Sequence, residues 1–449
     1  NYNVVVGDEA GTAITTGDSN VALGYQAGAS LTGGNSNVAI GYQALLTEDS
    51  YGANIAIGDS ALKLQDSGAT AYNVAIGHEA GAAVTTGIYN TLIGGLAGDA
   101  ITTADNNTGV GYKSLTVSTT GTQLTALGAY SLQRNTTASY NTGVGYNTLG
   151  NTTTGDRNLA VGTSALEANT TGANNTALGS NALDSNTTAS NNTAVGKSAL
   201  AANTTGTFNV AVGSLAGDAN TTGNYNTALG YNSFGINTTG SNNIAIGALA
   251  LDSNTTASDN VAVGVNALGV NTEGNLNVSI GGQSLSTNTV GDRSVAVGYG
   301  TLSAQNPVSD TDMYNTAVGY SAGVAVTTGT LNTLLGGLTG DALTTGNNNT
   351  ALGMASLGND TQGSKSTAVG VAALYEQNFT SATDSYNTAV GYNAGTSVTT
   401  GVQNTLIGGL AGDAITTVSN TTAVGYNSLG SNTTGTSNTA VGDVSATSN

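Results

Sequence analysis

Residues 237–247, NTTGSNNIAIG, contain the motif from which the fold of the whole chain follows. The last five of them, Asn-Ile-Ala-Ile-Gly, recur in variant form along the entire sequence, and the closing glycines run from position 7 to position 442. Twenty-two of the twenty-five intervals between these glycines are 17 residues long, one is 19 and two are 21. A fixed internal period of this length predicts one repetitive solenoid rather than several globular domains.

We number the unit from Asn243 as position 1, so that Gly247 is position 5 and each unit ends at position 17. Position 4 is Val, Ile or Leu in all twenty-six units, position 2 is Val, Ile, Leu or Thr in all of them, and position 3 is Ala in nineteen. This alternation predicts a short β-strand, because Gly and Asn interrupt every window long enough for a helix. The sequence therefore predicts an all-β, parallel β-solenoid (β-roll) of about 26 coils, stacked about 4.8 Å apart into a shaft of roughly 120 Å.

Two further positions vary together. Position 9 is Leu in most units but Gly in nine, and in eight of those nine position 12 is aliphatic. One apolar slot in each coil is thus filled from either side, which is typical of a packed interior. The unit with Gly217 and Asn220 is the exception, and this argument does not explain it.

The polar positions of the unit have structural explanations. Asn occupies position 1 in twenty-two units, and a column of such amides can donate and accept hydrogen bonds from coil to coil. The Thr-Thr-Gly that follows position 12 predicts a corner, in which we expect the glycine to supply a positive φ.

The strand has two faces, and the sequence leaves open which of them points inward. Positions 2 and 4 share one face, and the small residues at positions 1, 3 and 5 share the other. Neither an Asn-Ala-Gly stripe nor a Val and Ile ladder is expected at a wet surface, so we expect both faces to be covered. This indicates a homo-oligomer, most economically a trimer around the long axis.

The segments NVAIGYQALL (37–46), NVAIGHEAG (73–81) and NIAIGALAL (243–251) carry a resemblance to known proteins. They resemble the head repeats of trimeric autotransporter adhesins, and the full unit with NTTG is similar to the trimeric β-roll shaft repeats of phage tail fibres. The resemblance covers essentially the whole chain. It implies a homotrimeric fibre, extracellular on a virion or a bacterial cell surface, with a cell-surface glycan or receptor as its partner.

Composition restricts the other classes of function. The chain has 449 residues, a net charge of −19 and no cysteine, and only 7% of its residues are charged against 38% hydrophobic. An acidic chain cannot neutralise phosphates, which argues against nucleic-acid binding, and no apolar run is long enough for membrane insertion. No cofactor-binding motif, catalytic constellation or metal-spaced cluster stands out, so we expect no enzyme, no cofactor and no metal.

Several residues invite a chemical role and have a simpler explanation. His78, the single histidine, occupies a position where Tyr is common, and we interpret it as a surface substitution. The Asn-x-Thr sequons, as at Asn135 and Asn169, follow from the coil consensus and leave glycosylation open. Sixteen of the nineteen tyrosines fall at positions 6 or 17, either as rings that pack at coil edges and between chains or as stripes that stack on sugars. Aspartates in the AGDA-type segments suggest turn caps more than calcium ligands; they are Asp99, Asp218, Asp341 and Asp413.

Three coils are longer than the rest, with insertions near 62–72, 302–314 and 374–386. All three replace the Thr-Thr-Gly corner, so the loops are expected on one edge of the shaft, where solenoids often bind their partners. The candidate surface-binding residues on these loops are Asp66, Asn306, Met313, Phe379 and Asp384. We interpret residues 1–449 as a single shaft and as a fragment of a longer fibre.

The sequence thus favours a structural fibre shaft that mediates attachment to a host or a surface, without catalysis. Two alternatives remain. One is a self-assembling extracellular filament or matrix protein. The other, less favoured, is an ice-binding β-solenoid, because adjacent threonines point to opposite faces and leave one exposed column at best.

Overall fold

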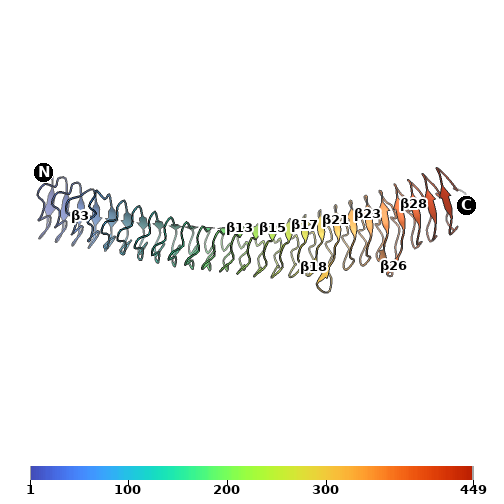
Figure 1. Ribbon diagram of the computed structural model, residues 1–449, viewed down its shortest axis with the longest axis horizontal. Coiled ribbons are helices and arrows are strands. Elements are labelled where there is room, and N and C mark those ends of the chain that lie inside the picture. Colours follow the sequence, from blue (N-terminus) through green and yellow to red (C-terminus); the bar gives the residue numbers. More distant parts are fainter. Residues whose placement is uncertain (1, 447–449) are drawn as a thin grey trace. The chain divides into compact units, whose positions relative to one another are not determined.

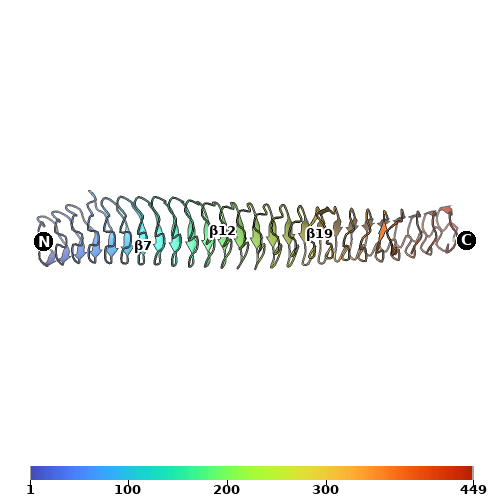
Figure 2. The same ribbon diagram turned by 90° about the horizontal axis from the view of Figure 1, so that it is seen from below.

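The computed structural model describes residues 2–446 and confirms an all-β parallel β-solenoid with one coil per repeat unit (Figures 1 and 2). Residues 1 and 447–449, which the predicted shaft also includes, lie outside the described residues. None of the described residues forms a helix that is long and apolar enough to cross a membrane.

The coils fall into two units, residues 2–223 and 224–446. The first unit contains thirteen coil strands: β1 Val4–Val6, β2 Val21–Leu23, β3 Val38–Ile40, β4 Ile55–Ile57, β5 Val74–Ile76, β6 Thr91–Ile93, β7 Thr108–Val110, β8 Thr125–Leu127, β9 Thr142–Val144, β10 Leu159–Val161, β11 Thr176–Leu178, β12 Thr193–Val195 and β13 Val210–Val212.

The second unit contains thirteen coil strands and four two-residue strands. The coil strands are β14 Thr227–Leu229, β15 Ile244–Ile246, β16 Val261–Val263, β17 Val278–Ile280, β19 Val295–Val297, β21 Thr316–Val318, β22 Thr333–Leu335, β23 Thr350–Leu352, β25 Thr367–Val369, β27 Thr388–Val390, β28 Thr405–Ile407, β29 Thr422–Val424 and β30 Thr439–Val441. The short ones are β18 Gly291–Asp292, β20 Thr311–Asp312, β24 Gly363–Ser364 and β26 Thr383–Asp384.

Within each unit, successive coil strands pair in parallel and in register. In β15 and β16, for example, Ala245 lies opposite Ala262 and Ile246 opposite Val263. Each strand is only three residues long, so every coil position forms a column along the stack. A residue type that recurs at one position therefore makes a continuous stripe.

The small face of the strand points inward, which settles the alternative that the sequence left open. The position 3 alanines are buried, as at Ala177 and Ala245, and so are the Asn side chains at position 1. The residues at positions 2 and 4 face outward and are exposed or half-buried, as at Ile246 with 37% of its surface exposed. The aliphatic ladder of the repeat is thus on the outside of the coil.

The Asn column at position 1 joins each coil to the next with two hydrogen bonds. The Asn243 side chain accepts from the backbone N–H of Asn260 at 3.1 Å and donates to the Ala257 carbonyl at 2.9 Å. These bonds satisfy amides that are fully buried, which would otherwise cost about 1–3 kcal/mol each. The predicted amide column is confirmed.

A second amide column at position 12 explains the unit with Gly217 and Asn220. Asn186 donates to Asn169 at 2.9 Å, Asn203 to Asn186 at 3.2 Å, and Asn220 to Asn203 at 2.9 Å. Asn220 continues this buried ladder, so the amide contact decides the residue type there instead of the volume of the slot.

The slot shared by positions 9 and 12 is also confirmed. A Cβ atom on Gly98 would come within 2.8 Å of the Ile101 side chain, which occupies the space that Leu fills elsewhere. Position 9 has a positive φ whichever residue it holds, 57° at Gly98 and 54° at Leu166. Leu rarely adopts this backbone region, and burial of its side chain, worth about 1.5–3 kcal/mol, offsets the strain.

The expectation of a positive φ at the corner glycine is wrong. Gly172 and Gly240 are not in that region; their Cβ atoms would instead collide with the carbonyl of the next coil. Close approach therefore favours glycine there, and Ala189 takes the same position in another coil. The positive φ occurs at the position 5 glycine, as at Gly264 with 135°, where the chain leaves the strand.

Candidate functional site

The two inserted loops of the second unit are built alike. In each, the loop adds a short strand that pairs in parallel with the coil before it, β20 with β18 and β26 with β24. In Figure 1 these strands lie on the edge of the second unit opposite the coil strands, in agreement with the expectation that the insertions replace the corner. The loops are therefore ordered extensions of the coil.

Each of these loops carries a cation, a carboxylate and an aromatic ring in contact. Lys365 donates to Asp384 at 2.6 Å and to the Tyr386 hydroxyl at 3.0 Å, and its ammonium lies 5.0 Å from the ring centroid. These hydrogen bonds, first that to Asp384, raise the pKa of Lys365 above its ordinary value. Arg293 pairs with Asp312 and lies over Tyr314 in the same way. Both clusters are partly exposed and fasten the loop to the preceding coil.

Three of the five predicted loop residues are at the surface. Asp66, Asn306 and Asp384 are exposed. The prediction is wrong for Met313 and Phe379, which are 0% and 6% exposed. Both side chains are buried and belong to the interior of their long coils.

The first insertion contains an acidic cluster that the sequence did not single out. Oxygen atoms of Glu48, Asp49 and Asp66 lie within 4.8 Å of one another, the one such group of three possible metal ligands among residues 2–446. Glu48 is fully buried, and its Oε2 has no hydrogen-bond partner. Burial raises the pKa of Glu48 to about 7, with Asp66 and Asp49 adding to the shift and the backbone N–H groups of Tyr51 and Ser67 opposing it. A Glu at position 12, where Asn is usual, was the available signal.

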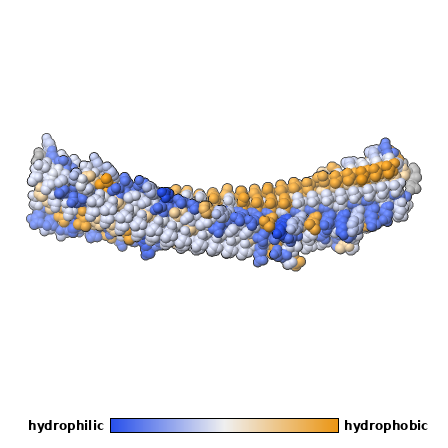
Figure 3. Space-filling model, viewed as in Figure 1, coloured by the Kyte–Doolittle hydropathy of each residue, from blue (hydrophilic) through white to orange (hydrophobic). Residues whose placement is uncertain are grey.

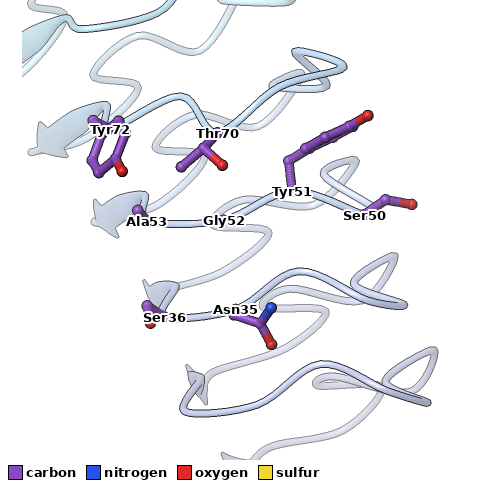
Figure 4. A pocket seen from close by; sticks show the side chains of 8 residues that line it. All are labelled: Asn35, Ser36, Ser50, Tyr51, Gly52, Ala53, Thr70 and Tyr72. Atoms are coloured by element: carbon purple, nitrogen blue, oxygen red, sulfur yellow. The ribbon is translucent and has the colours of Figure 1, made fainter.

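A shallow cavity of about 270 Å³ lies beside this insertion. Three successive coils line it with their position 14 to 17 residues, and Figure 4 shows Tyr72 at the start of a strand and the Tyr51 ring pointing away from the strands. The other lining residues are Asn35, Ser36, Ser50, Gly52, Ala53 and Thr70. The cavity is small and polar and brings no catalytic group together.

The tyrosines stack along the coils. Tyr25 and Tyr42 have parallel rings with centroids 5.5 Å apart, and Tyr299 and Tyr320 have the same arrangement at 6.1 Å. Most of these rings are exposed. They flank the strand face, where they are available both to sugars and to a neighbouring chain, so both alternatives stay open.

The residues with simpler explanations are placed as follows. His78 is exposed, 3.7 Å from Asp59 and 3.8 Å from Glu79, and these distances are longer than hydrogen bonds. Asn135 and Asn169 are fully buried and donate to the corner carbonyl of their own coil, so neither is accessible to a glycan.

The AGDA-type aspartates act on their own turns. Asp99 and Asp413 accept hydrogen bonds from the backbone at the same turn, while burial, the larger effect, raises the pKa of both. This agrees with turn caps.

The outward strand face forms a regular feature of the surface of each unit. We define the apolar strip as the side chains at positions 2 and 4, which are Val, Ile, Leu or Thr in every unit and never charged. In the second unit, Ile244, Ile246 and Ile280 are 37–39% exposed. Figure 3 shows the strip as a hydrophobic band along the strand-bearing edge of that unit.

The comparisons with known proteins leave the function to be argued from the structure. The sequence matches no protein-family model and no curated protein.

Proposed function

We propose that this chain is a structural fibre shaft of the tail-fibre or adhesin type, which acts outside the cell in attachment to a host or a surface and carries out no catalysis. The single observation that supports it most is the apolar strip. The proposed functional state is a homotrimer in which the strips of three chains face one another along the fibre axis.

The size of the strip argues for a covering partner. Thirteen rungs about 4.8 Å apart and two side chains wide give a strip of roughly 600 Å² in each unit, the size of the largest apolar patches of ordinary monomers. Its position 4 side chains are all aliphatic, and its position 2 side chains are Thr in fifteen of the twenty-six coils. The patch is also flat, regular and free of charge. An identical chain presents a strip with the same rung spacing, so it matches along the whole length.

The residues around the strip suit an interface rim. Exposed tyrosines at positions 6 and 17 flank the strand at both ends, and amphipathic rings of this kind are common at protein interfaces. The acidic residues that give the net charge of −19 lie outside positions 2 and 4. Mutual repulsion therefore does not act within the seam itself.

A shaft also has to be stiff. Every coil contributes backbone hydrogen bonds to the next, such as Gly264 N–H to Ile246 at 2.7 Å, together with the two buried amide columns. Neighbour-to-neighbour contacts of this kind accumulate along a stack of repeats. The exposed loops and tyrosines are the surfaces on which a glycan or receptor would be engaged.

The oligomeric state tests this proposal. We expect analytical ultracentrifugation of the purified chain at micromolar concentration to give three times the chain mass. The double variant I246K/I280K places charges on the strip and should give a monomer, because desolvating six lysines in a trimer costs several kcal/mol per charge. Circular dichroism should stay unchanged, since both side chains point out of the coil.

The variant T256K is the matched control, because Thr256 is exposed at the corner and lies off the strip. It should leave the mass unchanged. A well-folded wild-type monomer at micromolar concentration would remove the proposal, as would an unchanged oligomer in I246K/I280K.

Ice binding is a second candidate, favoured by one specific observation. Position 2 is Thr in the last eight coils of the second unit, so these threonines form an outward column about 4.8 Å apart on the strand face. Of the corner threonines, those at position 13 donate to the next coil's carbonyl, as Thr255 does, and those at position 14, such as Thr256, are exposed and form one column at the corner. Ice binding requires the strip to face water, so a trimer without thermal hysteresis excludes it.

A further inference from the structure

The three inserted loops place equivalent residues at the same three positions, and the first loop differs from the other two. In each case a Gln stands at position 12 of the long coil, as Gln65, Gln305 and Gln377. The residue that follows this Gln is adjacent to the residue at position 13 of the preceding coil. These pairs are Asp49 with Asp66, Thr289 with Asn306, and Thr361 with Asn378.

In the second and third loops this pair is a hydrogen bond. The Thr289 hydroxyl donates to the Asn306 amide oxygen at 2.7 Å, and the Thr361 hydroxyl to the Asn378 amide oxygen at 3.1 Å. In the first loop both members are aspartates. Two carboxylate side chains cannot form the hydroxyl-to-amide hydrogen bond that closes the other loops.

A third carboxylate, that of Glu48, lies next to this pair. Glu48 is fully buried, its Oε1 accepts from the Tyr51 N–H at 3.2 Å, and its Oε2 has no partner. In the other loops the glutamine Nε2 donates to the equivalent residue, Asn288 at 3.3 Å and Asp360 at 2.6 Å. That contact is missing here, because Glu48 Oε2 and the Gln65 Nε2 are both without a partner.

No positive charge of the protein compensates this group. None of the ion pairs between residues 2 and 446 involves Glu48, Asp49 or Asp66. Their oxygens nevertheless lie within 4.8 Å of one another, the separation at which a single ion contacts all three. A buried carboxylate oxygen without a hydrogen-bond partner is costly, and a bound cation removes that cost.

We propose that Glu48, Asp49 and Asp66 bind one divalent cation, with water completing its coordination. All three ligands are carboxylates, and the site has no nitrogen or sulfur donor, so the ion is a hard one. Calcium suits it best, because two ligands are exposed and calcium accepts irregular oxygen geometry, whereas magnesium requires a near-ideal octahedron. The ion ties the loop at 62–72 to the coil before it, in place of the Thr–Asn hydrogen bond of the other loops.

The chain supplies its own control variants. D49T/D66N gives the first loop the Thr–Asn pair whose hydrogen bond closes the second and third loops. The coil should therefore fold while the calcium site is lost. T361D/N378D does the reverse in the third loop, where Asp360 already provides the buried carboxylate. Calorimetric titration of the full chain with calcium chloride should show one saturable site, with Kd on the order of 10⁻⁴–10⁻³ M.

We expect D49T/D66N to lose at least tenfold in calcium affinity and T361D/N378D to gain a second site. Hydrogen exchange of residues 62–72 should slow with calcium in the wild type and not in D49T/D66N. Unchanged calcium binding in D49T/D66N would mean that scattered surface carboxylates bind the ion, and it would overturn the proposal. The absence of saturable binding up to about 10 mM calcium would overturn it as well. Should D49T/D66N fail to fold, E48N, which places the usual Asn at position 12, should lose the site in the same way, and unchanged calcium affinity in E48N would overturn the proposal. The result does not depend on the oligomeric state, so it can fail without the proposed function failing.

Discussion

Leu92 replaces Ala at position 3 in a coil where position 9 is glycine, and truncating it tests how the interior is filled. Cβ atoms built on Gly81 and Gly98 would lie 2.9 Å from Leu92 Cδ1 and 2.7 Å from its Cδ2. The two branches of Leu92 therefore occupy the space that leucines fill in other coils. The side chain is fully buried.

The expected cost of L92A follows from this arrangement. Removing three carbon groups loses about 2.4 kcal/mol of transfer free energy at about 0.8 kcal/mol each. The cavity adds to this, because glycines on both sides have no side chain that could move into it. We expect a loss of about 4–5 kcal/mol, at the upper end of the range for Leu to Ala.

Local hydrogen exchange is the appropriate assay, because a stack of repeats need not unfold in one step. In peptides covering residues 90–101, a loss of about 4 kcal/mol corresponds to roughly 1000-fold faster exchange. L64A is the matched control, because Leu64 is 45% exposed and its truncation leaves no cavity. It should change exchange little.

A triple variant sharpens the test. L92A/G98L/I101N rewrites the coil with the residue types of Ala160, Leu166 and Asn169, whose coil has the same backbone. Leu is accommodated at position 98 because φ there is 57°, against 54° at Leu166. We expect this variant to recover about half of the loss, because the new Leu fills the space beside position 98 while the space beside Gly81 stays empty. Wild-type exchange in L92A, or a triple variant no better than L92A, would refute the shared slot.

Two further predictions concern the backbone and pH. G264A should destabilise its coil by about 3 kcal/mol or more, because φ is 135° and the new Cβ would lie 2.7 Å from the Gly281 oxygen. G337A is the control and should be near neutral, because its Cβ would lie in open space. Equal shifts of the thermal unfolding midpoint in the two variants would contradict this prediction. Burial raises the pKa of Asp360, so the carboxyl group holds its proton more tightly in the folded coil than in the unfolded chain. The contribution of Asp360 to the stability of its coil is therefore fully present below about pH 4 and falls as pH rises through the raised pKa. D360N, which copies Asn288 of the second loop, should remove that fall in exchange measured from pH 4 to 7; a wild-type stability that rises over this range would refute the assignment.

Much of this fold could be predicted from the sequence because the repeat is so regular. The 17-residue period, the strand, the Asn column and the slot shared by positions 9 and 12 all follow from residue types and spacing. The inward face could not be predicted, because a period of two shows which residues share a face and does not distinguish two faces that are both free of charge. The positive φ of leucines such as Leu166 could not be predicted, because Leu rarely adopts the left-handed backbone region.

The candidate sites were predicted less well, for a related reason. Met313 and Phe379 were assigned to the surface because they lie in insertions, but a longer coil also places apolar side chains in its interior. Glu48 and Asp49 were missed because a Glu at position 12, although unusual in this repeat, does not by itself indicate a metal site. Their significance depends on Asp66, which is adjacent only once the coils are stacked.

The limited volume inside each coil explains why the aliphatic residues at positions 2 and 4 lie on the outer face of the strand. Leu334 and Leu406, like Leu92, occupy position 3 where position 9 is Gly in both coils that they touch. A large side chain thus stands at position 3 or at position 9 of a coil and not at both, while Ile101, Leu343 and Ile415 at position 12 accompany the leucines at position 3. With Leu at position 9, position 3 must be small, and the Val and Ile at positions 2 and 4 have no place inside. The aliphatic side chain at position 4 of every coil adds little to the packing of a single chain, which is why we propose that another chain covers the strip.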